Sequence, residues 1–280
     1  MKEKLISKDE VRNLSPILRG RFGNALLKMI FSITGINKVN GVYDGSKHKT
    51  GVEFVNDLLD RQGIIRIVEN QDVLDSLQNQ AFITVSNHPF GHIDGIIIIS
   101  VVAAKRKDFK MMVNWMLNRI DTMEGNFIGV NPYSKDSKMS TIKSSVGGVK
   151  QCLEHIRAGH PLGFFPAGGV SSSHFTYTKD REWQEPVLKL IKKAKVPVVP
   201  IYISGTNSWL YRFLGFIDWR LRMVRLLHEV TNKKGKKIYI RFGNPISVEE
   251  QSQFEDIKAF GEFLRAKTYE LQTEKTHGVF

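Results

Sequence analysis

The sequence has little or none of several features that define whole classes of protein. Its 280 residues include one cysteine, Cys152, which excludes an internal disulfide and a cysteine-cluster metal site. No apolar run reaches the roughly 18 to 20 residues that a membrane-spanning helix needs, because the run that begins at Gly95 ends at Lys105. The apolar sequence after Met1 is too short for a secretory signal. These absences predict a cytoplasmic protein in a reducing compartment.

Acidic residues are also scarce. There are 28 of them against 41 lysines and arginines, which leaves a formal net charge of +13. We therefore expect an anionic neighbour: a nucleic acid, an anionic membrane surface or an acidic carrier protein, among which the charge alone does not choose. The remaining composition, 41% hydrophobic and 25% charged, is that of an ordinary globular protein with a real core, in which Cys152 is expected to lie.

The first 50 residues are predicted to form a separate helical segment. Ser7 and Glu10 have the spacing of a capping box, which indicates a helix start. Residues 17–31 are basic, aromatic and apolar, which fits either a helix lying in a membrane interface or an amphipathic helix packed in the core. Residues 35–49 contain three glycines and are expected to be a connector. The remaining residues, 51–280, are assigned to one larger domain.

From residue 51 onward, strand patterns alternate with helix patterns. This alternation predicts an α/β fold with a mixed, largely parallel sheet flanked by helices. Helices are expected to begin at capping boxes opened by Thr50 and Ser247, at Asn70 and near residue 140. Pro197 and Pro200 predict an edge position or irregular ends for the strand that contains them. The predicted strands are 64–68, 81–85, 109–113, 127–130, 162–165, 196–203 and 237–242.

The stretch from Ser86 to Gly95 lies between a β-branched run and a long apolar segment, which predicts a strand, a tight turn and a helix. Its polar side chains then lie at a strand end, where open α/β sheets bind ligands. His88 can exchange a proton near neutral pH, and Asp94 is near enough in sequence to orient its ring. Such a pair is the minimum for making a hydroxyl or an amine attack a carbonyl.

Other interpretations of this stretch stay open. His88 and Asp94 can form a buried structural pair without chemistry, or His88, His92 and Asp94 can bind a metal. Pro89 and Gly91 disfavour a regular helix through both histidines, which counts against the metal site. For His92 itself, packing in the turn is the favoured interpretation.

Two more strand ends carry distinctive residues, Gly168–Gly169 after residues 162–165 and Asn131–Pro132 after residues 127–130, although each by itself can be a plain turn. Gly168 and Gly169 allow close approach of the backbone and offer N–H groups to an anion or an oxyanion. Taken in order, four blocks of the chain resemble the glycerolipid acyltransferase superfamily, the membrane-associated enzymes related to lysophosphatidic acid acyltransferase. The blocks, which span about residues 80–203, are 87–94, 127–132, 165–171 and 196–200.

The chain departs from the common family pattern at three places. Five residues separate His88 from Asp94 where the family has four, Ala167 stands at the position of the family's Glu, and Val170 stands at that of its Arg. In the common branch those two polar side chains help to hold a phosphate-bearing acceptor, so phosphatidic acid synthesis is disfavoured here. Residues 87–95 are similar, position for position, to the bacterial hemolysin-like branch, which includes enzymes that O-acylate lyso-aminolipids such as N-acyl ornithine or N-acyl glycine.

The resemblance implies a mechanism and a set of site residues. His88 would act as the general base on an acceptor hydroxyl that attacks an acyl thioester, and Asp94 would orient its ring. The amides near Gly168 and Gly169 are candidates for binding the oxyanion. No cofactor and no metal are implied. The residues expected to bind substrate are Asn87, Pro89, Gly91, Asn131, Phe165, Pro166, Gly168, Gly169 and Ser171.

The expected enzyme is an O-acyltransferase that is peripheral on the inner face of the cell membrane. Its donor would be an acyl-carrier protein or acyl-CoA, and its acceptor a lyso-aminolipid, with a lysophospholipid second. Basic clusters at 105–107, 192–195 and 233–237 either dock an anionic donor or are simply solvated surface. From Trp209 to Leu227 aromatics interleave with arginines, which suits a membrane interface or nucleic acid, although core packing is expected for most of the aromatics.

Three alternatives stay open at this point. One is a lysophosphatidic-acid-type acyltransferase within the same superfamily. Another is a basic, non-catalytic protein that binds a membrane or nucleic acid, although no nucleic-acid partner is expected. The third is a metal-dependent hydrolase that uses His88, His92 and Asp94.

Overall fold

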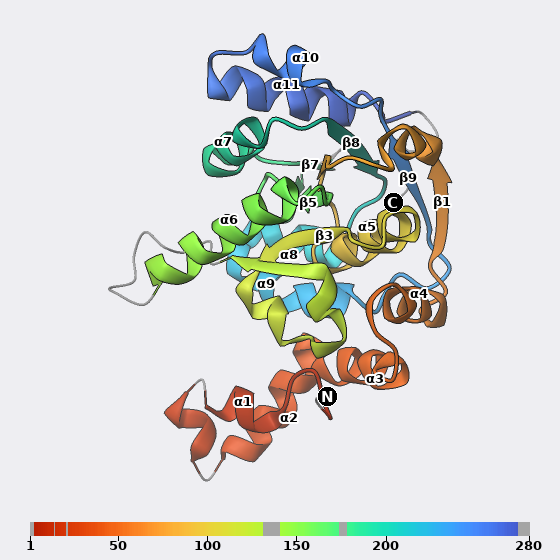
Figure 1. The fold of residues 1–280 in the computed structure, drawn as a ribbon. Coiled ribbons are helices and arrows are strands. Elements are labelled where there is room, and N and C mark those ends of the chain that lie inside the picture. The colour runs from red at the N-terminus through yellow and green to blue at the C-terminus, as the bar shows by residue number, and fades with distance from the viewer. Residues whose placement is uncertain (1–2, 14, 21, 131–140, 174–177, 274–280) are drawn as a thin grey trace.

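A computed structural model of the protein describes residues 3–13, 15–20, 22–130, 141–173 and 178–273 (Figure 1). Its α-helices are α1 (Lys8–Arg12), α2 (Gly23–Thr34), α3 (Ile36–Ser46), α4 (Gly51–Arg61), α5 (His92–Lys105), α6 (Thr141–Arg157), α7 (Glu185–Ala194), α8 (Trp209–Ile217), α9 (Trp219–Glu229), α10 (Val248–Ser252) and α11 (Ile257–Tyr269). The strands are β1 (Ile65–Glu69), β2 (Ile83–Ser86), β3 (Lys110–Asn114), β4 (Phe127–Val130), β5 (Leu162–Phe164), β6 (Ser172–Ser173), β7 (Thr178–Lys179), β8 (Val198–Ile203) and β9 (Lys237–Phe242). Short 3-10 helices are η1 (Pro16–Arg19), η2 (Gln71–Leu77), η3 (Trp115–Arg119) and η4 (Asp121–Asn126).

The main sheet has the strand order β1-β9-β8-β2-β5-β3-β4. Every neighbouring pair in it is parallel except β8 and β9, so the predicted α/β fold with a mixed, largely parallel sheet is confirmed. The edge position predicted for β8 is wrong, because β8 lies between β9 and β2. Pro200 is tolerated there because pairing with β9 begins only at Ile201, and the Pro200 carbonyl still accepts from the N–H of Gly243 at 2.8 Å.

Helices cover both faces of the sheet, as the alternation of strand side chains requires (Figure 1). In β8, Val199 and Ile201 belong to the core formed with α4 and α5, whereas Val198 belongs to the core formed with α6, α7 and α11. Helix α5 is apolar nearly all round and is buried accordingly, with Ile97 to Ile99 fully inaccessible. Cys152 of α6 lies in the core as predicted, and burial raises the pKa of its thiol to about 12.

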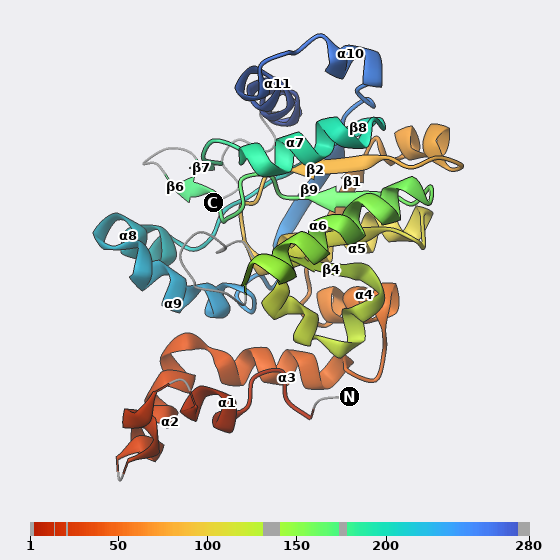
Figure 2. The same ribbon diagram turned by 60° about the vertical axis from the view of Figure 1, so that its left-hand side comes forward.

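The three N-terminal helices lie to one side of the sheet domain (Figure 2). The connector predicted for residues 35–49 is wrong, because Ile36–Ser46 forms α3. Ile36, Val39 and Tyr43 recur at helical spacing on its buried face, so packing overrides the glycine content. The single helix predicted for 17–31 is also interrupted: the chain turns between η1 and α2, where a Cβ on Gly23 would lie only 2.1 Å from the Leu18 carbonyl oxygen.

The predicted helix caps are partly confirmed. Ser7 and Glu10 form a complete capping box at α1. Thr50 stands at the N-cap of α4 but its side chain makes no capping hydrogen bond, and Asn70 adopts a left-handed conformation before a 3-10 helix without capping it. Ser247 caps only the five-residue α10, since the terminal helix α11 is capped by Asp256.

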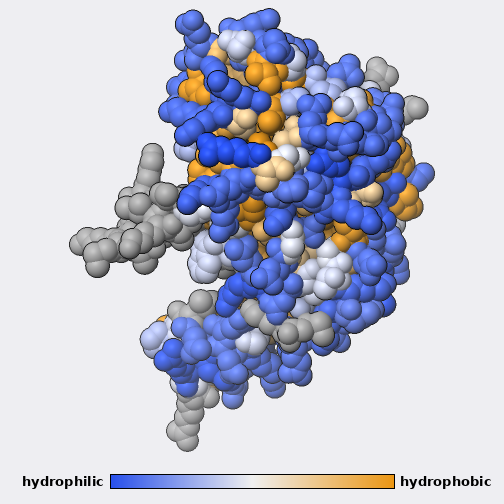
Figure 3. All heavy atoms as spheres, in the orientation of Figure 1, coloured by the Kyte–Doolittle hydropathy of each residue, from blue (hydrophilic) through white to orange (hydrophobic). Residues whose placement is uncertain are grey.

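Helices α8 and α9 form a hairpin inserted between β8 and β9, next to α2 (Figure 2). The core packing expected for most of its aromatics is wrong. Tyr211 is buried, but the large side chains of the hairpin that face outward are 39–71% exposed. These are Trp209, Leu210, Phe213, Phe216, Ile217, Trp219, Leu221, Met223 and Val224. Figure 3, drawn in the orientation of Figure 1, shows a mainly hydrophilic face. The hairpin lies behind this face, on the far side of the molecule.

Among the described residues, no helix combines the length and the apolarity needed to cross a bilayer.

Candidate active site

The polar turn begins where β2 ends, and Asn87 fixes that end to the neighbouring strand. Its side-chain Nδ2 donates to the Ile203 carbonyl at 2.8 Å, and its Oδ1 accepts from the Ile203 N–H at 2.7 Å. The Asn87 side chain thus continues the β2–β8 ladder for one more step and is buried. Asn87 is one of the residues expected to bind substrate, but both polar atoms of its side-chain amide are already hydrogen-bonded to the backbone of Ile203.

His88 and Asp94 meet as the sequence predicts. The Nδ1 atom of His88 lies 2.8 Å from Oδ2 of Asp94, and the Asp94 side chain is fully buried. The same Oδ2 accepts from the N–H groups of Phe90 and Gly91, both at 2.9 Å. Because Asp94 lies in the first turn of α5, these two hydrogen bonds and the helix dipole stabilise its negative charge.

The ring of His88 is held on its other sides as well. It stacks on Phe165, which follows β5, with the ring centroids 4.1 Å apart and the planes 15° from parallel. Asp94 accepts from Nδ1, so Nε2 is the ring nitrogen left to take a proton. The His88 side chain is 16% exposed. This is the geometry of an oriented general base.

A buried carboxylate that sequence reasoning missed supports the same turn. Asp180 accepts from the His88 backbone N–H at 3.2 Å, from the Ser171 hydroxyl at 2.5 Å and from the Trp183 indole at 3.1 Å. Ser171 returns a bond from its N–H to the His88 carbonyl at 2.9 Å. Burial raises the pKa of Asp180. The sequence carries no signal for this role, since Asp180 stands in a charged stretch that is typical of a surface loop.

Gly91 has a backbone requirement that no other residue meets well. Its φ of +93° is strained for a side-chain-bearing residue, and a Cβ would lie 3.0 Å from Val170 and 3.2 Å from Leu226. Pro89, also predicted for the site, is buried in the same turn. Both residues therefore shape the turn through the backbone.

The glycine block packs close to the turn. Pro166 is buried and accepts from the Gln184 N–H, and Ala167 lies in the core, where it accepts from Nε of Arg181 at 2.8 Å. The N–H of Gly168 donates to the Phe165 carbonyl at 3.0 Å, so this amide is already used. Asn131, the remaining predicted site residue, lies outside the described residues.

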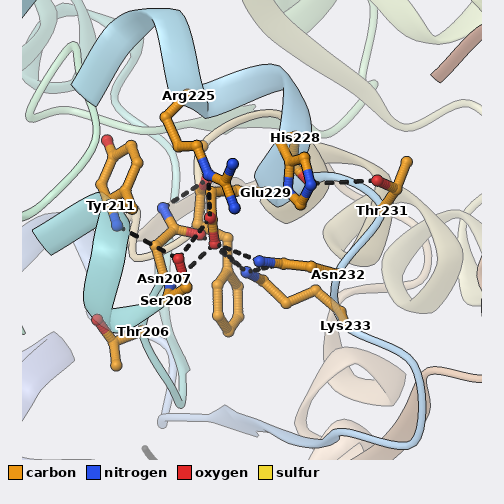
Figure 4. A network of polar contacts seen from close by, with 12 residues as sticks. Thr206, Asn207, Ser208, Tyr211, Arg225, His228, Glu229, Thr231, Asn232 and Lys233 are labelled. Carbon is orange, nitrogen blue, oxygen red and sulfur yellow. Dashed lines mark hydrogen bonds and ion pairs between the residues drawn. The ribbon is translucent and has the colours of Figure 1, made fainter. Parts of the chain in front are cut away.

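A second buried network ties the α8–α9 hairpin to the turn (Figure 4). Asn207 donates to the carbonyls of Pro89 and Phe90 at 3.4 and 3.2 Å. Lys233 donates to Asn207 Oδ1 at 3.0 Å and to Glu229 Oε2 at 2.9 Å, and its ammonium lies 5.1 Å from the Phe90 ring centroid. Burial lowers the pKa of Lys233, against the opposing effect of Glu229. The sequence offered no signal for these partners, because Asn207 and Phe90 are 117 residues apart.

His92 packs in the turn, as favoured from the sequence. Its Nδ1 atom is buried with no hydrogen-bond partner among the described residues, and desolvation lowers its pKa to about 4, with help from the nearby His88. A neutral imidazole is the form that fits this place. Within the described parts of the chain, no cluster of three or more His, Cys, Asp or Glu side chains gathers to hold a metal ion.

The chain has an α/β fold with a histidine–aspartate pair just after strand β2, and its similarity to known proteins gives its class. Residues 17–278 match the acyltransferase family model, so the chain belongs to this family and is an acyltransferase. The chain is 25% identical over 248 residues to lyso-glycine lipid O-acyltransferase of Bacteroides thetaiotaomicron, covering 84% of this chain and 85% of that protein. A protein of the same name from Phocaeicola vulgatus is 24% identical over 246 residues, covering 84% and 83%.

A solved structure is also similar. The 1-acyl-sn-glycerophosphate (LPA) acyltransferase PlsC from Thermotoga maritima aligns with a TM-score of 0.46 and 17% identity, over 95% of this chain and 98% of that one. The predicted resemblance to the glycerolipid acyltransferase superfamily and to its lyso-aminolipid branch is confirmed by the family match and the two curated relatives.

Proposed function

We propose that the protein transfers a fatty acyl group from an acyl thioester to the hydroxyl of a lyso-aminolipid, with an N-acyl glycine type of acceptor preferred and a lysophospholipid second. The observation that carries this proposal is the 2.8 Å contact between His88 Nδ1 and the buried Asp94. The name shared by the two curated relatives supports the choice of acceptor. The donor is an acyl-carrier protein or acyl-CoA, both of which are anionic, in keeping with the net charge of +13.

In this mechanism Nε2 of His88 removes the proton from the acceptor hydroxyl as its oxygen attacks the thioester carbonyl. Asp94 holds the ring and stabilises the imidazolium that forms. The tetrahedral intermediate then expels the thiolate, which takes the proton from His88, so an ester and a free thiol are the products. The amide of Gly169 is the candidate donor to the oxyanion, since that of Gly168 is bonded to Phe165.

Both substrates of this reaction carry fatty chains, so the enzyme is proposed to work at the inner face of the cell membrane. The apolar surface formed by α2, α8 and α9 supports this location. Phe22, Met29 and Ile33 of the α2 region are 52–83% exposed, and helix α2 contacts α9 of the hairpin. In Figure 2 these three helices lie on one side of the molecule. Aromatic and aliphatic side chains flanked by basic residues suit a bilayer interface.

The direct test is to incubate the purified protein with a labelled acyl thioester and a panel of lyso-lipids. We expect labelled diacylated glycine lipid together with one free thiol for each ester formed. Thiol release without a lipid product would replace the proposal with a thioesterase. Salt-sensitive DNA binding without any turnover would favour a non-catalytic basic protein.

A further inference from the structure

A small cavity lies where the α8–α9 hairpin meets the segment that follows the glycine block. Its volume is about 240 Å³, and its lining residues are Ser172, Arg212, Gly215, Trp219 and Arg222. Among these described lining residues, Arg212 and Arg222 carry guanidinium groups and none is acidic. The chemistry of the wall therefore selects an anion.

The cavity lies next to the residues that hold the catalytic turn. Ser172 directly follows Ser171, whose N–H donates to the His88 carbonyl. Val170, one residue earlier, packs against Gly91 and so touches the same turn. The cavity therefore borders the segment that packs on the turn carrying His88.

Arg222 supplies one of the two guanidinium groups of the cavity wall. Its Nε atom is buried without a hydrogen-bond partner among the described residues, and no ion pair to its guanidinium is found in that part of the chain. The guanidinium lies 6.0 Å from the ring centroid of the buried Tyr211. Because Arg222 lines the cavity and its Nη groups make no hydrogen bond among the described residues, these donors are available to an oxyanion in the cavity.

Gly215 lets Arg222 reach this position. A Cβ on Gly215 would lie 3.0 Å from Cδ of Arg222, so the side chain of Arg222 crosses α8 at the one residue that leaves room for it. Arg212 adds a second guanidinium from α8. Trp219 is 61% exposed and forms a rim that continues into the apolar surface. An anionic group at the head of an apolar chain matches this arrangement of a basic cavity inside an apolar rim.

We propose that this cavity binds the anionic head group of the acceptor lipid, with Arg212 and Arg222 pairing with its oxyanion. The inference rests on the proposed function and makes these two arginines the residues that determine acceptor specificity. Two arginines can pair with either a carboxylate or a phosphate. The proposed acceptor, an N-acyl glycine, supplies a carboxylate.

The test compares Arg222→Gln and Arg212→Gln with Arg220→Gln, which removes the same charge from the same hairpin at an exposed position that does not line the cavity. With a lyso-glycine lipid, we expect the KM for the acceptor to rise on the order of ten- to a hundredfold in the first two variants, with the KM for the thioester unchanged. With the uncharged amide of the same acceptor, the three variants and the parent protein should have similar KM values. A lysophosphatidic acid arm shows whether a phosphate can replace the carboxylate.

Equal effects of Arg222→Gln on the charged and the uncharged acceptor would overturn the inference. An increase confined to the KM for the thioester would also overturn it, because the cavity would then bind the donor. Calorimetric titration of a short-chain N-acyl glycine into the parent protein and Arg222→Gln separates this result from failure of the proposed function. Binding that depends on Arg222 without acyl transfer would support the anion site and refute the proposed acyl transfer. Acyl transfer without binding that depends on Arg222 would support the proposed function and refute the anion site.

Discussion

The side-chain amide of Asn207 donates to the carbonyl of Phe90 at 3.2 Å, so the start of the α8–α9 hairpin is bonded to the turn that carries His88. Lys233 orients this amide by donating to its oxygen, and Glu229 neutralises Lys233 in a site where both side chains are almost completely buried. The hairpin and the turn that carries His88 are therefore joined through one buried polar network (Figure 4).

Removal of Lys233 should be strongly destabilising. In Lys233→Met the Glu229 carboxylate stays buried without its cation, and breaking a buried pair in this way costs about 3 to 5 kcal/mol. Chemical denaturation should show this loss in the free energy of unfolding. The control is Lys234→Met, at the exposed neighbouring position, which should change the midpoint little. Equal midpoints for the two variants would contradict a structural role for the network.

Two glycine substitutions should have effects of opposite sign. Gly91→Ala places a Cβ at a φ of +93° and 3.0 Å from Val170, so it should destabilise the fold by roughly 1 to 2 kcal/mol or more and misplace the turn. Gly41→Ala, in the interior of α3 with open space around it, should stabilise by about 0.5 to 1 kcal/mol. Thermal unfolding of both variants checks the pair. A stable, fully active Gly91→Ala protein would refute the close packing proposed for the turn.

The stability of the fold should fall below neutral pH in part through His92. Its folded pKa is lowered to about 4 from an ordinary value near 6.5, so between these values the unfolded chain binds a proton that the folded protein does not. Stability is then complete above about pH 6.5 and is lost as the pH falls toward 4. In His92→Gln, the slope of unfolding free energy against pH should decrease in this window. An unchanged slope would show that His92 is not held neutral.

The exposed aromatics of the hairpin should govern binding to lipid. Trp209 and Phe213 are stacked with their centroids 5.2 Å apart and are 71% and 44% exposed, so the double substitution to Ser removes apolar area without opening the core. We expect weaker cosedimentation with vesicles that contain anionic lipid. Trp115→Ser is the matched control, since Trp115 is 49% exposed but lies in η3, outside the apolar surface. Equal losses in the two proteins would argue against a specific membrane face.

Much of the architecture could be predicted from the sequence because it is encoded locally. The alternation of β-branched runs with amphipathic stretches identified the main-sheet strands, and the turn between β2 and α5 followed from Pro89 and Gly91. Helix α3 was missed because its glycines lower the local propensity, whereas tertiary packing of Ile36, Val39 and Tyr43 decides its structure.

The site was predictable only where its residues are close in sequence. His88 and Asp94 are six residues apart, and their contact was anticipated. Asp180 and Asn207 reach the same turn from 92 and 117 residues away, and no local pattern announces such partners. The exposure of the hairpin aromatics was missed for a related reason: the interleaving of aromatics and arginines does not show which face a sheet domain leaves uncovered.

In the proposed mechanism, His88 acts as the base and Asp94 acts through it. The decisive measurement is kcat for acyl transfer in His88→Ala, Asp94→Asn and the double variant, each shown to be folded by its unfolding midpoint. We predict that His88→Ala lowers kcat on the order of a hundred- to ten-thousandfold, and that adding Asp94→Asn to it causes no further loss. Near-normal turnover by a folded His88→Ala protein, or independent and multiplicative losses from the two changes, would contradict this account.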